Sequence, residues 1–454
     1  MKNTLFLVGS FLLINSCISS ASKFSSKDAE VNTELTKEDN QLLDQVQKDA
    51  LKYFWDYAEP QSLLARERFH PDGQYPQDDA NIITTGGSGF GLMTIIVGVD
   101  RGFVPREEAV KRLHHMLDFL EKSDRYHGAW SHWIDGETGK TKPFGKMDNG
   151  GDLVETAFLV QGLIVVKEYF SNGNVDEKAL ALKADKLWKG VDWNWYTNNR
   201  DFLFWHWSPT YEWQMNFPLE GYNECLITYV LAAASPEYSI TKEVYNKGWN
   251  RSGKILSDAK KYDIPVVVKH NGEDNSVGPM FWSQYSYIGL DPRDLKDDFT
   301  NYWDVNVNHS KIVYQYQQDN PKNYKGYGQN FWGLTASYTR NPDGSIGYTA
   351  HSPQNDNGVV TPTAALSSFP YTPKESMQFL KFIYNQENKQ KFIGEAGPYD
   401  ALSIEYNWVA PYYLAIDQGT IAPMIENYRT GLIWKLFMQN KDVQKGLKKL
   451  GFKN

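Results

Sequence analysis

An apolar segment that begins with acidic residues, 147–166, is the sequence feature that most constrains the fold. Asp148, Asp152 and Glu155 have the spacing i, i+4, i+7, which places three carboxylates on one face if the whole segment is helical. The opposite side of the helix is also apolar, and a helix that is apolar all round is normally buried. Buried acids are rare unless they are paired, bind a ligand or take part in chemistry. The segment therefore predicts an interior helix with candidate catalytic carboxylates at its N-terminal end.

Structural roles are an alternative for some of these acids. An Asp near a helix start often caps it, and acids there interact favourably with the helix dipole. Gly150 and Gly151 also leave open whether Asp148 is helical. Capping explains one or two of the acids, but it does not explain Glu155, one turn inside an apolar helix. Structural ion pairing of all three stays an alternative to catalysis.

A second segment, 217–231, repeats the pattern. Glu220 and Glu224 are four residues apart, and Ile227 and Leu231 continue the same helical face. Two interior helices of this kind would place carboxylates around one cavity, where repulsion and burial raise one pKa. Glycoside hydrolysis uses two such carboxyl groups, namely a protonated acid for the leaving oxygen and a carboxylate as base or nucleophile. Glu224 is the stronger catalytic candidate because it lies deeper. Glu220 is a substrate-binding candidate that is equally compatible with an ordinary first-turn acid.

Aromatic residues make up 15% of the chain, and several lie beside His or Ser in predicted loops. Such rings suit stacking against sugars, although large helical cores also use aromatic residues. The net charge of −8 argues against nucleic acid or an anionic membrane surface as the main partner and fits a neutral oligosaccharide or polysaccharide. The substrate-binding candidates from these loops are Arg66, Trp130, His132, Trp133, Trp205 and Trp207.

No cofactor or metal site is expected from the motifs. His residues are scattered without zinc-ligand spacing, and no calcium loop or nucleophile elbow is present. The glycine-rich run 84–91 lacks the spacing of a phosphate-binding loop. We expect it to form a tight turn beside the cleft.

The N-terminus predicts export and lipid attachment. Residues 1–16 have the pattern of a signal peptide, and their apolar run is too short for an ordinary membrane span. The run ends at Cys17, as in a bacterial lipobox, so Cys17 is the predicted lipidation site. A plain secretory signal cleaved nearby is the alternative. Cys225 is the only other cysteine, which makes a disulfide unexpected. We expect residues 17–38 to form a flexible tether and the protein to lie in a Gram-negative cell envelope, on the periplasmic side or the outer surface.

The rest of the chain, 39–454, is predicted to be one mostly helical domain. Breaker residues delimit helices over 41–58, 91–101, 106–122, 152–169, 176–191, 219–234, 240–256, 281–290, 295–318, 362–369, 373–386, 420–439 and 442–450. About six helix pairs indicate an all-α (α/α)6 toroid with long loops at one rim, and a short strand pair is expected within 193–207. Long irregular loops in a compact domain are usually functional. The sequence carries no signal for an oligomeric state.

Several short motifs together resemble a known family, the bacterial glucoamylase-like domain. They occupy residues 53–56, 65–68, 84–91, 223–224, 413–419 and 425–431. Within the family the chain is most similar to the endo-β-1,2-glucanases of Bacteroidota-type bacteria, which have an (α/α)6 toroid, and the resemblance covers about 39–454. The chain has Thr420 after Gln-Gly, where the family commonly has Pro.

The resemblance implies an activity and a set of site residues. The activity is hydrolysis of linear β-1,2-glucan to short sophoro-oligosaccharides, with inversion and without a cofactor. The family's Asp, Asp, Glu cluster corresponds to Asp148, Asp152 and Glu155, and a further Glu to Glu224. Asp417, in a late motif, is a further substrate-binding candidate. The resemblance leaves open which acid protonates the leaving group. The rival functions are an α-glucan exo-hydrolase and a non-catalytic, glycan-binding surface lipoprotein.

Overall fold

The computed structural model describes residues 35–453. Residues 35–40 contain only the beginning of helix α1 (Lys37–Trp55), whereas residues from Gln41 onward form one compact unit, to which the following description applies. The predicted signal peptide, Cys17 and most of the predicted tether lie outside the described residues. Among residues 35–453, no helix combines the length and apolar character that crossing a lipid bilayer requires.

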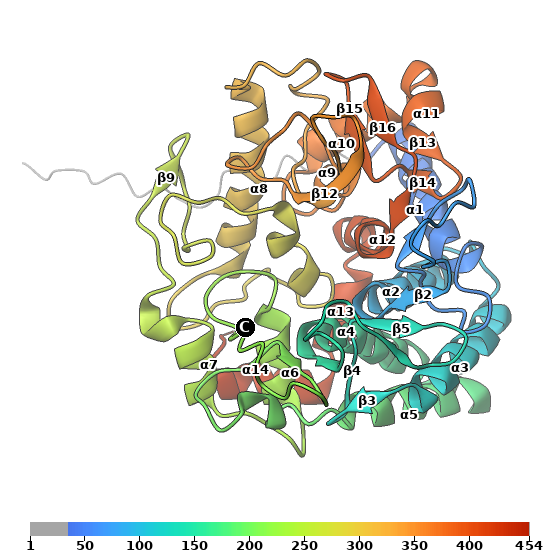
Figure 1. The fold of residues 1–454 in the computed structure, drawn as a ribbon, viewed down its shortest axis with the longest axis vertical. Helices are drawn as coiled ribbons and strands as arrows, with labels where there is room; N and C mark the ends of the chain where they lie inside the picture. Colours follow the sequence, from blue (N-terminus) through green and yellow to red (C-terminus); the bar gives the residue numbers. More distant parts are fainter. Residues whose placement is uncertain (1–34, 454) are drawn as a thin grey trace, which may run out of the picture. The chain divides into compact units, whose positions relative to one another are not determined.

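Six inner segments pack side by side around the interior of this unit (Figure 1). They are α2 (Thr85–Asp100), α4 (Leu153–Phe170), α6 (Leu226–Ala234), the short 3-10 helices η3 (Met280–Ser283) and η4 (Tyr285–Tyr287), α9 (Pro362–Leu366) and α12 (Ala415–Arg429). The Gln284 side-chain amide joins η3 and η4 to α9, because it donates to the Ala364 carbonyl at 2.9 Å. Since α12 packs against both α9 and α2, the ring of inner segments is closed.

Outer helices alternate with the inner ones along the chain. They are α1, α3 (Arg106–Lys122), α5 (Val175–Lys189), α7 (Lys242–Gly248), α8 (Tyr302–Asp319) and α10 (Pro373–Ile383). The outer α3 buries one stripe of apolar residues, whereas α4 is buried over almost its whole circumference. This alternation of inner and outer helices confirms the predicted (α/α)6 toroid. Three further helices, α11 (Gln386–Phe392), α13 (Leu432–Met438) and α14 (Lys441–Leu450), complete the α-helices of the described chain.

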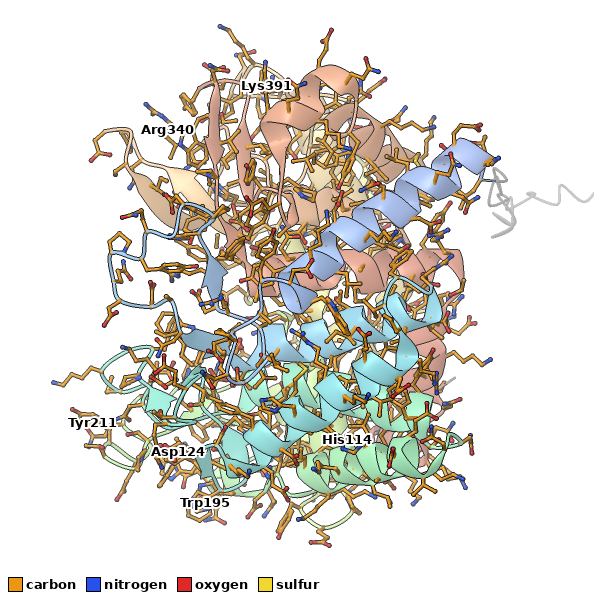
Figure 2. The ribbon with its side chains drawn as sticks, turned by 90° about the vertical axis from the view of Figure 1, so that its right-hand side faces the viewer. His114, Asp124, Trp195, Tyr211, Arg340 and Lys391 are labelled. Carbon is orange, nitrogen blue, oxygen red and sulfur yellow. The ribbon has the colours of Figure 1, made fainter. Side chains whose placement is uncertain are left out.

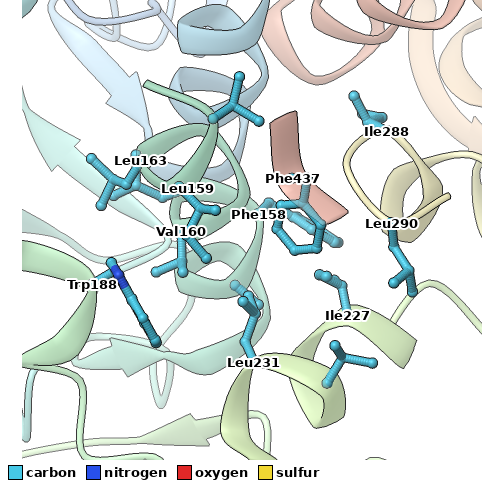
Figure 3. Packing of buried hydrophobic residues seen from close by; sticks show 14 of the residues in the cluster. Phe158, Leu159, Val160, Leu163, Trp188, Ile227, Leu231, Ile288, Leu290 and Phe437 are labelled. Atoms are coloured by element: carbon cyan, nitrogen blue, oxygen red, sulfur yellow. The ribbon is translucent and has the colours of Figure 1, made fainter. Parts of the chain in front are cut away.

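The core is centred on α4. In Figure 3, Phe158 and Val160 of α4 lie near Ile227 of α6, Trp188 of α5 and Phe437 of α13. Full burial of one such side chain contributes about 1.5–3 kcal/mol. The glycines of α2 and α4 allow the two inner helices to approach closely. A Cβ atom on Gly89 would collide with the α4 backbone, and one on Gly162 would collide with the α2 backbone.

The strands are short and belong to loops at the helix ends. They are β1 (Arg68–Phe69), β2 (Ile82–Thr84), β3 (Arg125–Tyr126), β4 (Ala129–Trp130), β5 (Trp133–Asp135), β6 (Thr141–Lys142), β7 (Gly151–Asp152), β8 (His206–Trp207), β9 (Lys260–Lys261), β10 (Ile264–Pro265), β11 (Ala336–Arg340), β12 (Ile346–Ala350), β13 (Ile393–Gly394), β14 (Gly397–Pro398), β15 (Ala401–Ser403), β16 (Trp408–Ala410) and β17 (Tyr413–Leu414). β7 pairs with β8, which brings the chain before α4 against the loop that precedes α6. β11 and β12 form the longest hairpin among them, with Tyr338 opposite Tyr348.

Several predicted elements differ from the structure. The run 84–91 is not a tight turn, because α2 begins at Thr85 and the glycines lie at its contact with α4. The helix predicted over 219–234 begins only at Leu226, and the one over 281–290 consists of 3-10 turns. The helix predicted over 420–439 is two helices, since Gly431 has a φ of +71° between α12 and α13. No strand pair lies within 193–207, where only β8 forms and its partner is β7.

Candidate active site

The N-terminal ends of all inner segments except α9 surround one cavity of about 730 Å³. Its wall includes Thr84 at the start of α2, Glu155 in α4, Glu224 just before α6, Tyr285 of η4 and Ile416 in α12. Helix N-termini carry partial positive charge and unpaired N–H groups, so they stabilise carboxylates. The toroid therefore brings residues that are distant in sequence to one cavity.

Asp152 fixes the start of α4 and does not line the cavity. It is the N-cap residue, and its Oδ1 accepts hydrogen bonds from the backbone N–H groups of Val154 at 3.0 Å and Glu155 at 2.9 Å. Its Oδ2 accepts from His132 Nδ1 at 3.0 Å and Trp205 Nε1 at 3.1 Å. Burial opposes ionisation, but hydrogen bonds from the histidines hold the Asp152 pKa well below its usual range. Asp152 is therefore an anion with four close N–H donors.

Asp148 lies in the loop before β7 and not on α4. The expectation that Asp148, Asp152 and Glu155 share one helical face is therefore wrong, because the helix begins after Asp152. Asp148 Oδ2 lies 3.3 Å from His206 Nε2 and 3.8 Å from His132 Nδ1. β7–β8 pairing places His206 directly opposite Asp152, which explains this contact.

His132 and His206 provide positive charge between these acids. Burial lowers their pKa values, but the surrounding carboxylates outweigh it and raise the pKa of His132 to about 10 and that of His206 to about 9. Both rings are therefore cations at neutral pH. We call Asp148, Asp152, Glu155, Glu224, His132 and His206 the histidine-balanced cluster.

Glu155 projects into the cavity from the first turn of α4. Its Oε2 accepts hydrogen bonds from the Gly86 backbone N–H at 2.7 Å and Thr84 Oγ1 at 3.3 Å, both at the start of α2. Its Oε1 lies 4.0 Å from His132 Nε2. Burial raises the pKa of Glu155 to about 7, against the opposing effects of His132 and these two donors.

Glu224 faces the same cavity from the turn that precedes α6. Asn223 Oδ1 accepts from the Cys225 backbone N–H at 3.0 Å, and Ser286 Oγ donates to the Glu224 carbonyl, so the turn is fixed on both sides. Burial raises the pKa of Glu224 to about 7. Its own backbone N–H opposes this shift, and the charges of Glu155 and Asp152 add to it.

A second pair of buried acids lies at the start of α12. Asp417 is in the first turn of α12, Asp400 directly precedes β15, and their carboxyl groups hydrogen-bond each other. Asp400 also accepts from the Tyr338 backbone N–H at 2.8 Å, and Asp417 accepts from the Tyr285 hydroxyl at 3.3 Å. Burial raises the pKa of Asp400 to about 7 and that of Asp417 well above its usual value. We call these two residues the α12 acid pair and infer that they share a proton.

The predicted substrate-binding residues divide into two groups. His132, Trp133 and Trp205 line the cavity, and Asp417 lies behind Tyr285 without lining it. Four others lie outside the cavity wall. Arg66 donates to the Tyr57 carbonyl at 3.2 Å, and the fully buried Trp130 donates to the Leu120 carbonyl at 3.0 Å. Glu220 is half-buried, and Trp207 contacts the rings of His127 and Trp195. Figure 2 shows Trp195 at the surface of the molecule, where 38% of it is exposed.

Other cavity residues were not among the predicted site residues, although Glu67 and Arg68 belong to the motif 65–68. They are Glu67, Arg68, His70, Asp79, Phe144, Tyr285, Tyr338, Tyr348 and Tyr412. A sequence signal exists for the hairpin residues, because the run Asn-Pro-Asp-Gly at 341–344 is flanked by polar and aromatic residues of strand character. The other residues come from irregular loops, which give no periodic signal.

A metal ligand set is geometrically conceivable within the histidine-balanced cluster. Ligand atoms of His132, Asp148 and Asp152 lie within 4.8 Å of one another. However, a histidine ligand must be neutral, and the pKa of His132 is raised to about 10. Its Nδ1 is also hydrogen-bonded to Asp152. The donor set therefore fits an ion-paired network better than a metal centre.

Comparisons with known proteins agree with the fold. The Glycoamylase family model, described as "Putative glucoamylase", matches residues 216–441. The chain is 44% identical over 433 residues to the exo β-1,2-glucooligosaccharide sophorohydrolase (non-reducing end) of Parabacteroides distasonis. This match covers 91% of the chain, which spans only 58% of the length of that curated relative.

Two solved structures are similar over nearly their whole length. The endo-β-1,2-glucanase of Chitinophaga pinensis, in complex with sophorotriose and glucose, is 53% identical with a TM-score of 0.88, and the match covers 91% of this chain and 98% of that one. A Bacteroides caccae protein is 54% identical with a TM-score of 0.88, over 91% and 99% of the two chains. The chain therefore belongs to the bacterial glucoamylase-like family of glycoside hydrolases.

Proposed function

We propose that this protein is an endo-acting glycoside hydrolase that cleaves linear β-1,2-glucan to short sophoro-oligosaccharides with inversion of configuration. The observation that carries the proposal is the presence of Glu155 and Glu224 in one cavity, each with a pKa raised to about 7. Acid–base catalysis is most efficient when the catalytic pKa lies near the working pH. The linkage and the endo mode are supported by the Chitinophaga enzyme, which this chain matches over almost its full length.

The surroundings of the two carboxyl groups favour different roles. Glu155 accepts two hydrogen bonds and lies near the cationic His132, which favours its ionised form. The only donor that lowers the pKa of Glu224 is its own backbone N–H, and two neighbouring anions raise it, which favours its protonated form. We therefore assign Glu224 as the general acid and Glu155 as the general base.

The reaction then proceeds in one displacement. Glu224 transfers its proton to the glycosidic oxygen while the bond from that oxygen to the anomeric carbon breaks. Glu155 accepts a proton from a water molecule whose oxygen attacks the anomeric carbon from the opposite face. The two products are a shortened chain and an oligosaccharide with an inverted anomeric centre. Proton exchange with solvent restores the starting protonation states.

The substrate proposal is tested by incubating the purified protein with linear β-1,2-glucan, with starch and with β-1,3-glucan. We expect a ladder of sophoro-oligosaccharides from the β-1,2-glucan only, with the α-anomer first in the NMR spectrum. Release of sophorose alone would indicate exo action, as in the Parabacteroides relative. Hydrolysis of starch alone would refute the proposed substrate, and binding without hydrolysis would support the glycan-binding alternative.

The role of Glu224 is tested by Glu224→Gln, with Glu220→Gln as a matched control outside the cavity wall. Loss of a general acid lowers turnover by about a hundredfold or more. An aryl sophoroside with a nitrophenol leaving group needs little protonation, so Glu224→Gln should lose much less activity on it. Equal losses on both substrates would contradict the assignment of Glu224 as the acid.

Membrane anchoring through Cys17 is proposed from the sequence alone. Cys17 follows a short apolar run and precedes a polar segment. Expression of the full chain should place it in the membrane fraction, and Cys17→Ala should move it to the soluble fraction without changing its melting temperature. Unchanged fractionation together with no lipid mass at the N-terminus would refute the anchor.

A further inference from the structure

One face of the β11–β12 hairpin forms a wall of the cavity. Directly opposed residues of antiparallel strands project to the same side of a sheet. The pairs Tyr338–Tyr348 and Arg340–Ile346 are opposed in this way, and Tyr338, Ile346 and Tyr348 all line the cavity. The hairpin therefore turns aromatic and aliphatic side chains toward the space where Glu155 and Glu224 lie.

Polar contacts hold the other face of the hairpin in place. Ser337 Oγ lies 2.8 Å from Thr361 Oγ1, and the Asn357 side-chain amide donates to Thr339 Oγ1 at 2.7 Å. In the turn, Asp343 Oδ1 accepts from the Ser345 backbone N–H at 2.9 Å. The wall is thus anchored from behind, independently of any molecule in the cavity.

Tyr348 is the unusual residue of this wall, because 60% of its surface is exposed. Within residues 35–453 it has no aromatic ring contact and no hydrogen-bond partner, whereas its neighbour Tyr338 is buried and contacts the His70 ring nitrogen at 3.3 Å. An exposed aromatic ring that lines a cavity offers a flat apolar face on which a ligand can stack.

A second exposed aromatic ring, Phe144, also lines the cavity. It is 51% exposed and comes from the loop after β6, close to the histidine-balanced cluster. Its ring stacks on His132 with centroids 4.1 Å apart and an interplanar angle of 13°. Phe144 and Tyr348 are therefore two exposed rings, one beside each group of acids.

We propose that Tyr348 and Phe144 are sugar-stacking platforms, and that Tyr348 determines how tightly the enzyme holds a β-1,2-linked chain. The apolar face of a glucose unit stacks on the Tyr348 ring, and the phenol hydroxyl is free to bond a sugar hydroxyl. Phe144 receives a different unit of the same chain, so affinity depends on a chain long enough to reach both rings. This inference rests on the proposed function and adds the residues that select the substrate.

The test compares Tyr348→Ala and Tyr348→Phe with the control Tyr238→Ala, whose side chain is 37% exposed outside the cavity wall. We expect Tyr348→Ala to raise KM for sophoro-oligosaccharides about tenfold, the scale of one aromatic contact, and to change kcat much less. Tyr348→Phe should stay within about threefold of wild type because the ring remains. All three variants should keep the wild-type melting temperature.

Binding is measured separately in the Glu224→Gln background, by titrating sophoro-oligosaccharides of increasing length and following tryptophan fluorescence. Tyr348→Ala should weaken binding of longer oligosaccharides about tenfold and that of sophorose less, and Phe144→Ala should show the same dependence on length. Unchanged KM and Kd in Tyr348→Ala, or an equal loss in Tyr238→Ala, would overturn the inference. If wild type binds these oligosaccharides but does not hydrolyse them, only the proposed reaction fails. If wild type does not bind them, both proposals fail.

Discussion

The histidine-balanced cluster and the α12 acid pair place buried carboxyl groups at similar points of the toroid, but Asp152 of the cluster is ionised whereas the pair retains a proton. Both lie where inner helices begin, and both are shielded from water. In the histidine-balanced cluster, two imidazolium rings, an indole N–H and the first backbone N–H groups of α4 surround Asp152. In the α12 acid pair, the two carboxyl groups hydrogen-bond each other, and they accept from the Tyr338 backbone N–H and the Tyr285 hydroxyl.

The difference shows that burial alone does not set the charge of an acid. Desolvation disfavours the ionised forms of Asp152, Asp400 and Asp417, but hydrogen-bond donors and cations outweigh its effect at Asp152. Without cations, the α12 acid pair retains a proton instead. An active site that needs both ionised and protonated acids near neutral pH can set each state through the number of hydrogen-bond donors and cations beside each carboxyl group. The following predictions test this contrast, in order of decreasing expected effect.

Asp152→Asn should cause the largest loss. The amide carries no charge to balance His132 and His206, and its NH2 group would face the N–H donors of His132 and Trp205, although its oxygen can still cap α4. Breaking a buried ion pair on one side costs about 3–5 kcal/mol, and we expect this loss in the free energy of unfolding measured with denaturant. Turnover should fall by about a hundredfold or more because Glu155 shares this network. Wild-type stability and turnover in this variant would show that the cluster is not charge-balanced.

Asp400→Asn should have the opposite effect on stability. The amide N–H takes the place of the shared proton, so Asp417 can ionise without a second charge beside it. The pKa of Asp400 rises from 3.8 to about 7 on folding, so the wild type loses stability as pH increases through this interval. At pH 8 the variant should be as stable as the wild type or more stable by about 1 kcal/mol, and the advantage should disappear at pH 4. A strong loss at pH 8, comparable to that of Asp152→Asn, would contradict proton sharing.

The two cationic histidines should define the alkaline limit of stability. Their pKa values rise from 6.5 to about 10 and about 9 on folding, so their contribution is full below pH 6.5 and is lost as pH rises through these values. The free energy of unfolding should therefore fall between about pH 7 and pH 10 in denaturant titrations. His206→Gln should show a smaller fall over that range. A wild-type curve that is flat across it would contradict the assigned charges.

The smallest effect is spectroscopic. His270 and His309 are buried without a carboxylate partner among residues 35–453. Burial lowers the pKa of His309 to about 4 and that of His270 well below its usual value. Both contact the Gly278 backbone, where His270 Nδ1 accepts from its N–H and His309 Nε2 donates to its carbonyl, each at 2.8 Å. Nitrogen-15 NMR at pH 7 should show His132 and His206 as imidazolium rings and these two as neutral rings. If all four imidazole rings were in the same protonation state, the proposed difference in charge between the two pairs of histidines would be wrong.

Much of the fold was predictable because inner and outer helices have different sequence patterns. The outer α3 was predicted with its observed bounds, since its breakers and its apolar stripe are both local signals. The glycine run 84–91 misled the prediction because glycine is normally a helix breaker. Its helical role depends on contact with α4, which local sequence does not reveal.

The site was predictable where an acid interrupts an apolar segment. Glu155 and Glu224 line the cavity, as the patterns around them suggested, but Asp148 and Glu220 are not helical residues. His206 and Tyr348 were not assigned roles because strand pairing places them, and these short pairings join distant segments. Trp130 was assigned to substrate, although it is a core residue, because aromatic residues serve both purposes.

The closure of the inner ring has a consequence for synthesis of the protein. α2 and α4 emerge early from a ribosome, yet α12, which packs against α2, emerges only near the end of the described chain. Until then, the apolar surface of α2 that α12 covers has no partner, which is the condition in which nascent chains aggregate or engage chaperones. A nascent chain that ends before residue 415 should therefore remain open and inactive, with ring closure as a late, slow step in its maturation.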